Sequence, residues 1–209
     1  MKTSPVRVKI CGITSTVDAH AAMDLGADAI GVIFADSRRR VTEKEAAEIS
    51  RAVGPWIAVL GVFVNESVPE MRRIARNCGL SAVQLHGQET PKAVASLGRD
   101  IKVVKAFHVG EGFKPSAMDD YSSVEAFLFD TKVPGLAGGT GVVFDWSLLK
   151  KFRSEKPFII SGGLHAGNVA QAIRHFRPYG VETASGVETV PGRKDLKKMK
   201  EFIRNAKKV

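Results

Sequence analysis

The sequence has only two cysteines, Cys11 and Cys78, among its 209 residues. Secreted domains that depend on disulfides use many more, so no disulfide framework is implied and a cytoplasmic location is expected. Long hydrophobic runs are also missing, since no apolar stretch approaches the roughly 18 residues of a membrane-spanning helix. The chain runs from Met1 into a strand-like segment without the apolar core of a secretory signal. We therefore expect no membrane partner.

Aromatic residues are scarce too, at 7% of the chain. The formal net charge of +9 raises the possibility of nucleic-acid binding, but the basic residues are not interleaved with aromatic side chains that could stack on bases. Residues 193–209 hold eight Lys and Arg against two acidic residues, and so supply +6 of the total. A solvated helix face accounts for that segment, and the remaining positive charge suits a small anionic substrate. We expect no nucleic-acid partner.

Strand-like apolar runs alternate with segments of helical period along the chain. Strands are expected at 5–10, 29–34, 57–64, 81–85, 101–106, 125–130, 157–161 and 180–184, and helical segments at 16–25, 42–53, 67–78, 90–97, 115–119, 145–152, 166–177 and 194–206. Thr42, Ser67 and Thr90 are the expected N-caps of three of these helices. Eight strand–helix units in about 200 residues match a closed (β/α)₈ TIM barrel better than an open sheet. With no linker in sight, residues 1–209 are predicted to form one α/β barrel domain.

The first strand ends in residues that are unusual for a packing surface. Alternation places Lys9 and Cys11 on one face, and Val8 and Ile10 on the other. In a barrel of this class, functional groups lie at the C-terminal ends of the strands. A lysine and a thiol at such an end indicate reactive side chains that line a site. A buried structural cysteine beside a surface lysine explains the same pattern. Both interpretations stay open on this segment alone.

Two glycine-containing loops follow the last two strands. Gly162 and Gly163 come after the seventh strand, and Ser185 and Gly186 after the eighth. Glycines let backbone N–H groups approach an anion, and these two loops are the usual phosphate site of this barrel class. Tight turns explain one such loop, whereas two at corresponding places favour phosphate binding. The segment 186–190 is expected to add a helical turn aimed at the ligand.

Asp130 ends the sixth strand. Alternation puts it on the same face as Ala126 and Leu128, with the phenylalanines between them packing outward. Because the sixth strand lies across a barrel from the first, the carboxyl group is expected to face the thiol of Cys11. An opposed pair of this kind suits proton transfer on a sugar phosphate. The glycine-rich loop 134–141 is expected to close over the substrate, and a flexible surface loop is the alternative.

Taken together, these motifs resemble those of the phosphoribosylanthranilate isomerase family. The resemblance rests on KICGIT at 9–14, QLHG at 84–87, FDT at 129–131, GGTG at 138–141, FDW at 144–146, SGGL at 161–164, SGVE at 185–188 and PG at 191–192. It implies a barrel of the ribulose-phosphate-binding type and an intramolecular oxidoreductase of the aldose–ketose isomerase class. The implied reaction is an Amadori rearrangement in tryptophan biosynthesis that needs no cofactor and no metal. The implied partner is a small anionic substrate, bound by a monomer or a homodimer.

The resemblance also implies residue roles. Cys11 is the expected general base and Asp130 the expected general acid, and Lys9 is expected to help Cys11 ionise, because a free thiol with a pKa of about 8.5 is mostly protonated at neutral pH. Arg39 is expected to hold the anthranilate carboxylate. The substrate-binding residues are expected to be Lys9, Arg39, Gln84, His86, Gly139, Gly162, Gly163, Glu182, Ser185 and Gly186.

Some of these roles stay open. The family usually has an aromatic residue where this chain has Arg40, so the register of the carboxylate-binding arginine within 38–40 is open. Relatives often carry aspartate at the position of Glu182, which leaves its role open, and His86 either lines the pocket or braces its loops. One alternative function is the ProFAR isomerase of histidine biosynthesis, which needs a second phosphate site at the ends of the third and fourth strands. Another is a barrel that binds a phosphate ligand without catalysis.

Overall fold

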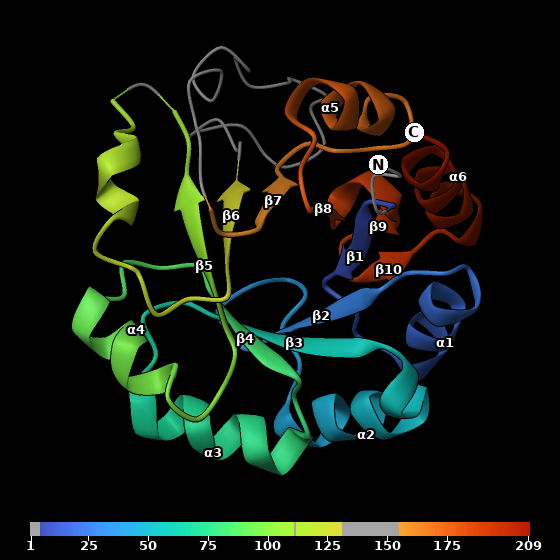
Figure 1. Ribbon diagram of the computed structural model, residues 1–209. Coiled ribbons are helices and arrows are strands. Elements are labelled where there is room, and N and C mark those ends of the chain that lie inside the picture. The colour runs from blue at the N-terminus through green and yellow to red at the C-terminus, as the bar shows by residue number, and fades with distance from the viewer. Residues whose placement is uncertain (1–4, 111, 131–154) are drawn as a thin grey trace.

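The computed structural model describes residues 5–110, 112–130 and 155–209, which form a closed barrel of eight parallel strands (Figure 1). Each strand pairs with the next along the chain, and the last pairs with the first. The strands are β1 (Arg7–Cys11), β2 (Ala29–Ile33), β3 (Ala58–Phe63), β4 (Ala82–Leu85), β5 (Val103–His108), β6 (Ala126–Asp130), β7 (Phe158–Ser161) and β8 (Gly180–Thr183). The predicted fold class is confirmed.

Helices cover the outside of the barrel (Figure 1). They are α1 (Thr16–Asp24), α2 (Glu43–Val53), α3 (Val68–Cys78), α4 (Pro91–Leu97), α5 (Val169–Phe176) and α6 (Leu196–Lys207), with 3₁₀ turns η1 (Gly54–Trp56) and η2 (Pro115–Met118). All three predicted N-caps are confirmed. The side chains of Thr42, Ser67 and Thr90 each accept a hydrogen bond from a backbone N–H of the first helical turn, which satisfies a donor that the helix leaves unpaired.

The two faces of the strands pack into two separate apolar clusters. The barrel interior holds Leu60, Ala82, Val104, Ala106, Ala126, Leu128 and Ile159. Val8 and Ile10 of β1, with Phe127 and Phe129 of β6, belong instead to the larger cluster between strands and helices. The alternation predicted for both strands is therefore confirmed. It turns Lys9, Cys11 and Asp130 toward the barrel axis.

Two segments differ from the sequence-based expectations. Strand β5 runs on to His108 instead of ending at 106, because it stays in register with β6 until His108 pairs with Asp130. After β8 the expected turn at 186–190 is a shorter 3₁₀ turn, η4 (Ser185–Val187). It is followed by a small antiparallel pair, β9 (Glu188–Val190) and β10 (Arg193–Lys194), which was not predicted. The expected loop 134–141 with Gly139, and the expected helix at 145–152, lie outside the described residues.

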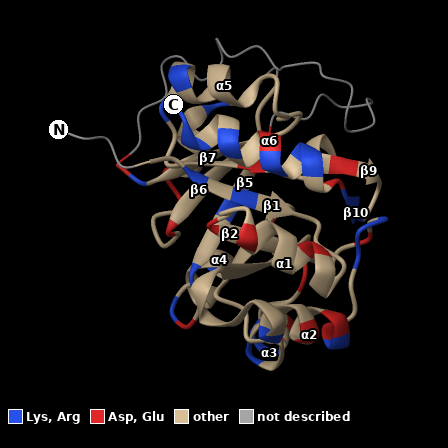
Figure 2. Ribbon diagram, turned by 90° about the vertical axis from the view of Figure 1, so that its right-hand side faces the viewer, with Lys and Arg blue, Asp and Glu red and all other residues tan. Residues whose placement is uncertain are grey.

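The basic C-terminal segment forms α6, which exposes most of its lysines and packs Met199, Phe202 and Ile203 against the barrel (Figure 2). The predicted solvated face is thus confirmed for the helix. Lys194, just before it, does not follow that prediction, because its side chain is fully buried. The composition of residues 193–209 indicates solvent exposure for the segment as a whole, and it therefore did not distinguish Lys194, which is buried.

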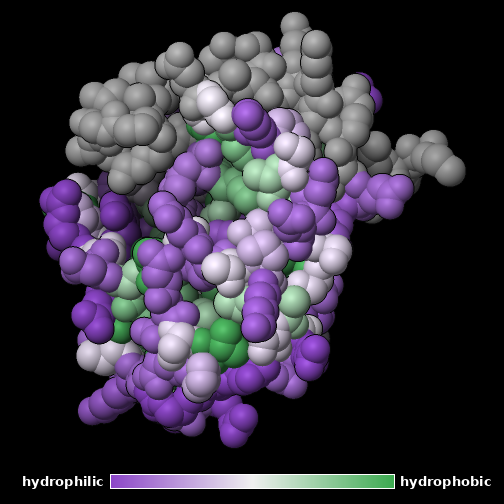
Figure 3. Space-filling model, turned by 90° about the vertical axis from the view of Figure 1, so that its left-hand side faces the viewer, coloured by the Kyte–Doolittle hydropathy of each residue, from purple (hydrophilic) through white to green (hydrophobic). Residues whose placement is uncertain are grey.

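On the side where α4 lies, hydrophilic side chains divide the exposed hydrophobic areas from one another (Figure 3). Within the described part of the chain, no helix combines the length and the apolar character that crossing a membrane would require.

Candidate active site

A cavity of about 470 Å³ opens at the C-terminal ends of the strands. This is where the fold places chemistry in barrels of this type. Most of the residues predicted from the sequence share its wall: Cys11, Arg39, Gln84, His86, Asp130, Gly162, Gly163, Glu182 and Ser185. Lys9 and Gly186 do not line it, and Gly139 lies outside the described residues.

Cys11 sits at the end of β1 and is almost completely buried. Burial, and then the negative charge of Glu182, raise the pKa of its thiol to about 11, although Lys9 and Lys194 both lower it. The Nζ atom of Lys9 lies 3.7 Å from the sulfur. The expected influence of Lys9 is present, because its charge lowers the pKa of the thiol, but it is outweighed. The neighbouring lysines do not overcome burial and Glu182.

Lys9 lies below the cavity and connects three strands. Its Nζ donates to Glu182 Oε2 at 2.6 Å and to Gln84 Oε1 at 2.5 Å. Ser161 Oγ donates to the other carboxylate oxygen of Glu182, at 3.2 Å. Burial lowers the pKa of Lys9, but Cys11 and Glu182 raise it by more, so that it stands above the ordinary lysine value. Lys9 thus acts as a buried cation that fixes the floor of the site.

The orientation of Gln84 sets the tautomer of His86. An ammonium group can only donate, so the amide atom that faces Lys9 is Oε1, and the Nε2 amide group is left facing His86 Nδ1 at 3.2 Å. His86 Nδ1 must then accept, and the ring proton sits on Nε2. That atom donates to Asp130 Oδ2 at 3.0 Å. A hydrogen-bonded chain therefore runs from the lysine beside the thiol to the carboxyl group across the barrel.

The glycines of the two loops serve different purposes. Gly162 and Gly163 have φ of 80° and 66°, a left-handed backbone that side-chain-bearing residues rarely adopt. Gly186 is needed for space instead, because a Cβ there would lie 2.0 Å from the carbonyl oxygen of Leu164. Thr183 Oγ1 donates to that same carbonyl at 2.7 Å, so the loops after β7 and β8 are held against each other.

Arg39 reaches the cavity with part of its guanidinium already engaged. Its Nε and Nη2 donate to the two carboxylate oxygens of Glu188, at 2.8 and 2.7 Å. Lys194 Nζ donates to Glu188 Oε1 at 2.9 Å and to the carbonyl of Cys11 at 2.6 Å. Sequence reasoning missed Glu188 and Lys194. Glu188 ends the SGVE motif and Lys194 lies in the basic C-terminal segment, but neither pattern points to Arg39 some 150 positions earlier.

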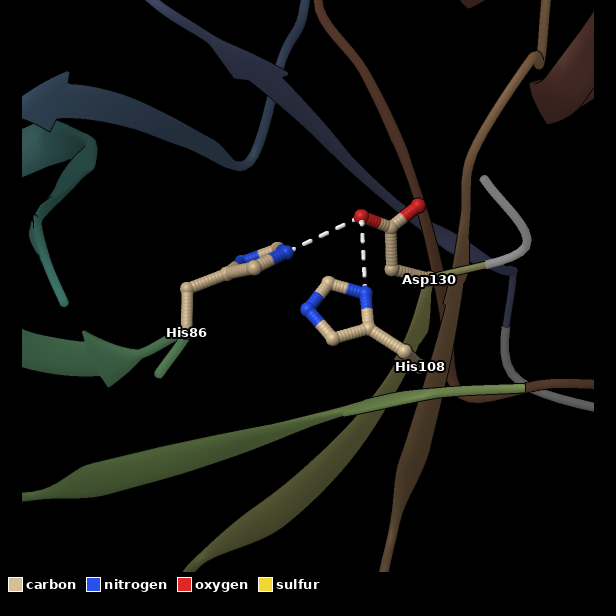
Figure 4. Close-up of side chains that lie close together, drawn as sticks. All are labelled: His86, His108 and Asp130. Atoms are coloured by element: carbon tan, nitrogen blue, oxygen red, sulfur yellow. Dashed lines mark hydrogen bonds and ion pairs between the residues drawn. The ribbon is translucent and has the colours of Figure 1, made fainter. Parts of the chain in front are cut away.

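His108 is a third residue that the sequence did not single out. Its Nδ1 lies 3.7 Å from Asp130 Oδ2, and its ring centroid lies 5.3 Å from that of His86 (Figure 4). Burial lowers the pKa of His108, and His86 and Lys105 lower it too, against a rise caused by Asp130. Extending the fifth strand by two residues would have placed His108 beside Asp130.

Comparisons with known proteins agree on one family. The family model described as N-(5′-phosphoribosyl)anthranilate (PRA) isomerase matches residues 8–205. An N-(5′-phosphoribosyl)anthranilate isomerase from Pelobacter propionicus is 45% identical over 203 residues, covering 97% of this chain and 96% of the relative.

Solved structures agree. The crystal structure of phosphoribosyl anthranilate isomerase from Thermotoga maritima superposes with a TM-score of 0.91 at 39% identity, over 98% of this chain and 100% of that one. A phosphoribosyl anthranilate isomerase in complex with reduced 1-(o-carboxyphenylamino)-1-deoxyribulose 5-phosphate gives a TM-score of 0.85 at 37% identity, again over 98% and 100%.

Proposed function

The chain belongs to the N-(5′-phosphoribosyl)anthranilate isomerase family of tryptophan biosynthesis, and from this premise we propose that Cys11 and Asp130 are the base and the acid of its reaction. The reaction is an Amadori rearrangement that converts N-(5′-phosphoribosyl)anthranilate to 1-(2-carboxyphenylamino)-1-deoxyribulose 5-phosphate. The observation that supports the assignment is that both residues line one cavity, at the C-terminal ends of β1 and β6.

Ring opening is the task of Asp130. Its proton passes to the furanose ring oxygen, the bond from that oxygen to C1′ breaks, and the anilino nitrogen supplies the electron pair that forms a protonated Schiff base. His86 orients the carboxyl group, because its Nε2–H donates to Oδ2 and leaves Oδ1 to carry the proton. A doubly protonated His86 would set its Nδ1–H against the amide N–H of Gln84, so the Lys9–Gln84–His86 chain disfavours transfer of the proton from Asp130 to the imidazole.

Proton removal from C2′ is the task of Cys11. The electron pair of the C–H bond forms the C1′–C2′ double bond and neutralises the Schiff base, and the resulting enolamine tautomerises to the ketone. Only the thiolate can accept the proton. Because burial and Glu182 raise the pKa of the thiol in the free protein, Cys11 ionises after ring opening, when the positive Schiff base stands close to the sulfur, and its proton passes to water in the open cavity.

The two ends of the substrate are held by different groups. The loops 161–164 and 185–187 bind the phosphate through backbone N–H groups. Arg39 binds the anthranilate carboxylate with the donors that Glu188 leaves over, because a guanidinium has five N–H groups and the ion pair occupies two of its nitrogens. Arg38 also lines the cavity and is the alternative if the register is displaced.

The two-phosphate substrate of the histidine pathway fits this site less well. A second phosphate would need free N–H groups at the ends of β3 and β4. The backbone N–H groups of Asn65 and Gly87 there already donate to Glu89 Oε1, at 2.9 and 3.0 Å. The buried carboxylate of Glu89 thus takes the N–H donors that a second phosphate would need, and its negative charge repels that phosphate.

The purified chain tests the assignment directly. We expect it to consume the fluorescent substrate N-(5′-phosphoribosyl)anthranilate, and we expect Cys11→Ser and Asp130→Asn each to slow turnover by about 10²- to 10⁴-fold, the usual worth of a general acid or base. Cys78→Ser is the matched control, because Cys78 is a buried thiol at the end of α3 and does not line the cavity. Unchanged turnover in the first two variants would reject the roles, and a chain that binds substrate without turnover would indicate a binding protein.

A further inference from the structure

Three side chains with metal-binding atoms meet at the mouth of the cavity (Figure 4). His86 follows β4, His108 ends β5 and Asp130 ends β6, so that neighbouring strands bring the three together. Asp130 Oδ2 lies 3.0 Å from His86 Nε2 and 3.7 Å from His108 Nδ1, and all three ligand atoms lie within 4.8 Å of one another.

We propose that His86 Nε2, His108 Nδ1 and Asp130 Oδ2 form a binding site for a divalent transition-metal ion, with Zn²⁺ as the representative case. Two imidazoles and a carboxylate are ligands that Zn²⁺ commonly takes. Tetrahedral bonds of about 2.0–2.1 Å separate ligand atoms by about 3.3 Å, a value that lies between the two separations from Asp130. The two separations from Asp130 are therefore close to those of a bound ion, and the two imidazole nitrogens lie within 4.8 Å of each other.

Among the described residues, the cluster is exposed on the side of His108. The His108 side chain is 61% exposed, whereas those of His86 and Asp130 are 19% and 13% exposed. The ion would thus be held against the cavity wall with one side open to solvent, and water can complete its coordination. Lys105, a buried cation whose charge acts on His108, is paired with Glu89 at 2.9 Å, which offsets that charge.

Metal binding at His86 requires a proton to move within the ring and a buried hydrogen bond to break. His86 Nε2 carries a proton in the network described above, and this proton has to move to Nδ1 before Nε2 can bind a metal. Gln84 must then turn its carbonyl oxygen toward the ring and give up its bond to Lys9. We therefore expect a site that fills and empties reversibly, unlike a structural zinc site.

Occupancy has a functional consequence, which rests on the proposed role of Asp130. A metal on Oδ2 holds Asp130 as the carboxylate, so this side chain can no longer carry the proton for ring opening. Metal ions of this class should therefore inhibit turnover, and a chelator should restore it.

Metal binding is measured first, without substrate. Co²⁺ is titrated into the full chain and followed by its visible absorption, and Zn²⁺ binding is followed by calorimetry. We expect one site per chain, with affinity at least about tenfold weaker in His108→Ala, because a ligand is lost. His20→Ala is the matched control, since His20 is an exposed histidine on α1. Equal affinity in the wild type and His108→Ala would overturn the site, as would binding that disappears in Cys11→Ser but persists in His108→Ala.

Turnover is measured second, with and without Zn²⁺ and then with EDTA. We expect inhibition of the wild type and of His20→Ala, and His108→Ala should keep its activity at the same Zn²⁺ concentration. Binding without inhibition would leave the metal site standing and would contradict the role of Asp130 as the acid. Inhibition that is equal in His108→Ala would contradict the metal site itself.

Discussion

The ammonium nitrogen of Lys9 lies 2.6 Å from a carboxylate oxygen of Glu182, and both side chains are about 5% exposed. This pair lies next to the thiol of Cys11, 3.7 Å from Nζ. The carboxylate offsets the positive charge that would otherwise favour the thiolate. The pKa of the Cys11 thiol thus depends on a residue that the chain places 171 positions later, on β8.

Glu182→Gln should lower the pKa of Cys11 from about 11, because it removes a negative charge that raises it while keeping a side chain of similar shape. We expect alkylation of Cys11 by iodoacetamide to reach its half-maximal rate at lower pH, measured in a Cys78→Ser background. Glu89→Gln makes the same change in the buried pair with Lys105 and should leave the profile unaltered. An unchanged profile in Glu182→Gln would show that the charge of Glu182 does not contribute to the pKa.

Arg39→Ala should raise KM by about 10- to 100-fold with little change in kcat, since a charge-assisted hydrogen bond to the substrate carboxylate is worth about 1.5–3 kcal/mol and is made equally in ground and transition states. Arg40→Ala is the control, because Arg40 is exposed and does not line the cavity. If Arg38→Ala or Arg40→Ala raises KM and Arg39→Ala does not, the carboxylate-binding position is wrong.

Gly163→Ala should weaken inhibition by inorganic phosphate and raise KM. Its φ of 66° is strained for alanine by about 1–2 kcal/mol, and relief of that strain moves the N–H groups of the loop. Gly79→Ala, with φ of 64° at the end of α3, carries a similar backbone cost away from the cavity. It should lower the melting temperature and leave phosphate inhibition unchanged. Unaltered phosphate inhibition in Gly163→Ala would place the anion elsewhere.

Sequence patterns between neighbouring residues predicted the strand faces and the helix starts well. The alternation in β1 and β6 decided which side chains turn toward the axis, and the caps at Thr42, Ser67 and Thr90 marked where helices begin. These features depend on residues close together in the chain, so they can be recognised without knowing the fold.

Pairings between distant residues could not be predicted in the same way. Glu188 holds Arg39 across 149 positions, and Lys194 turns inward from a segment whose composition indicates solvent exposure. His108 was missed because the apolar run of β5 ends one residue before it, and only pairing with β6 shows that the strand continues. The pKa of Cys11 likewise depends on burial and on Glu182, which sequence neighbours do not reveal.

The division of labour between Cys11 and Asp130 is tested most directly by the deuterium isotope effect on kcat/KM, measured with substrate labelled at C2′. If Cys11 removes this hydrogen, Cys11→Ser slows that step alone, and the isotope effect should rise above that of the wild type. If Asp130 drives the earlier ring opening, Asp130→Asn makes that step limiting, and the isotope effect should fall below that of the wild type. The same change in both variants, or the reverse pattern, would contradict the assignment.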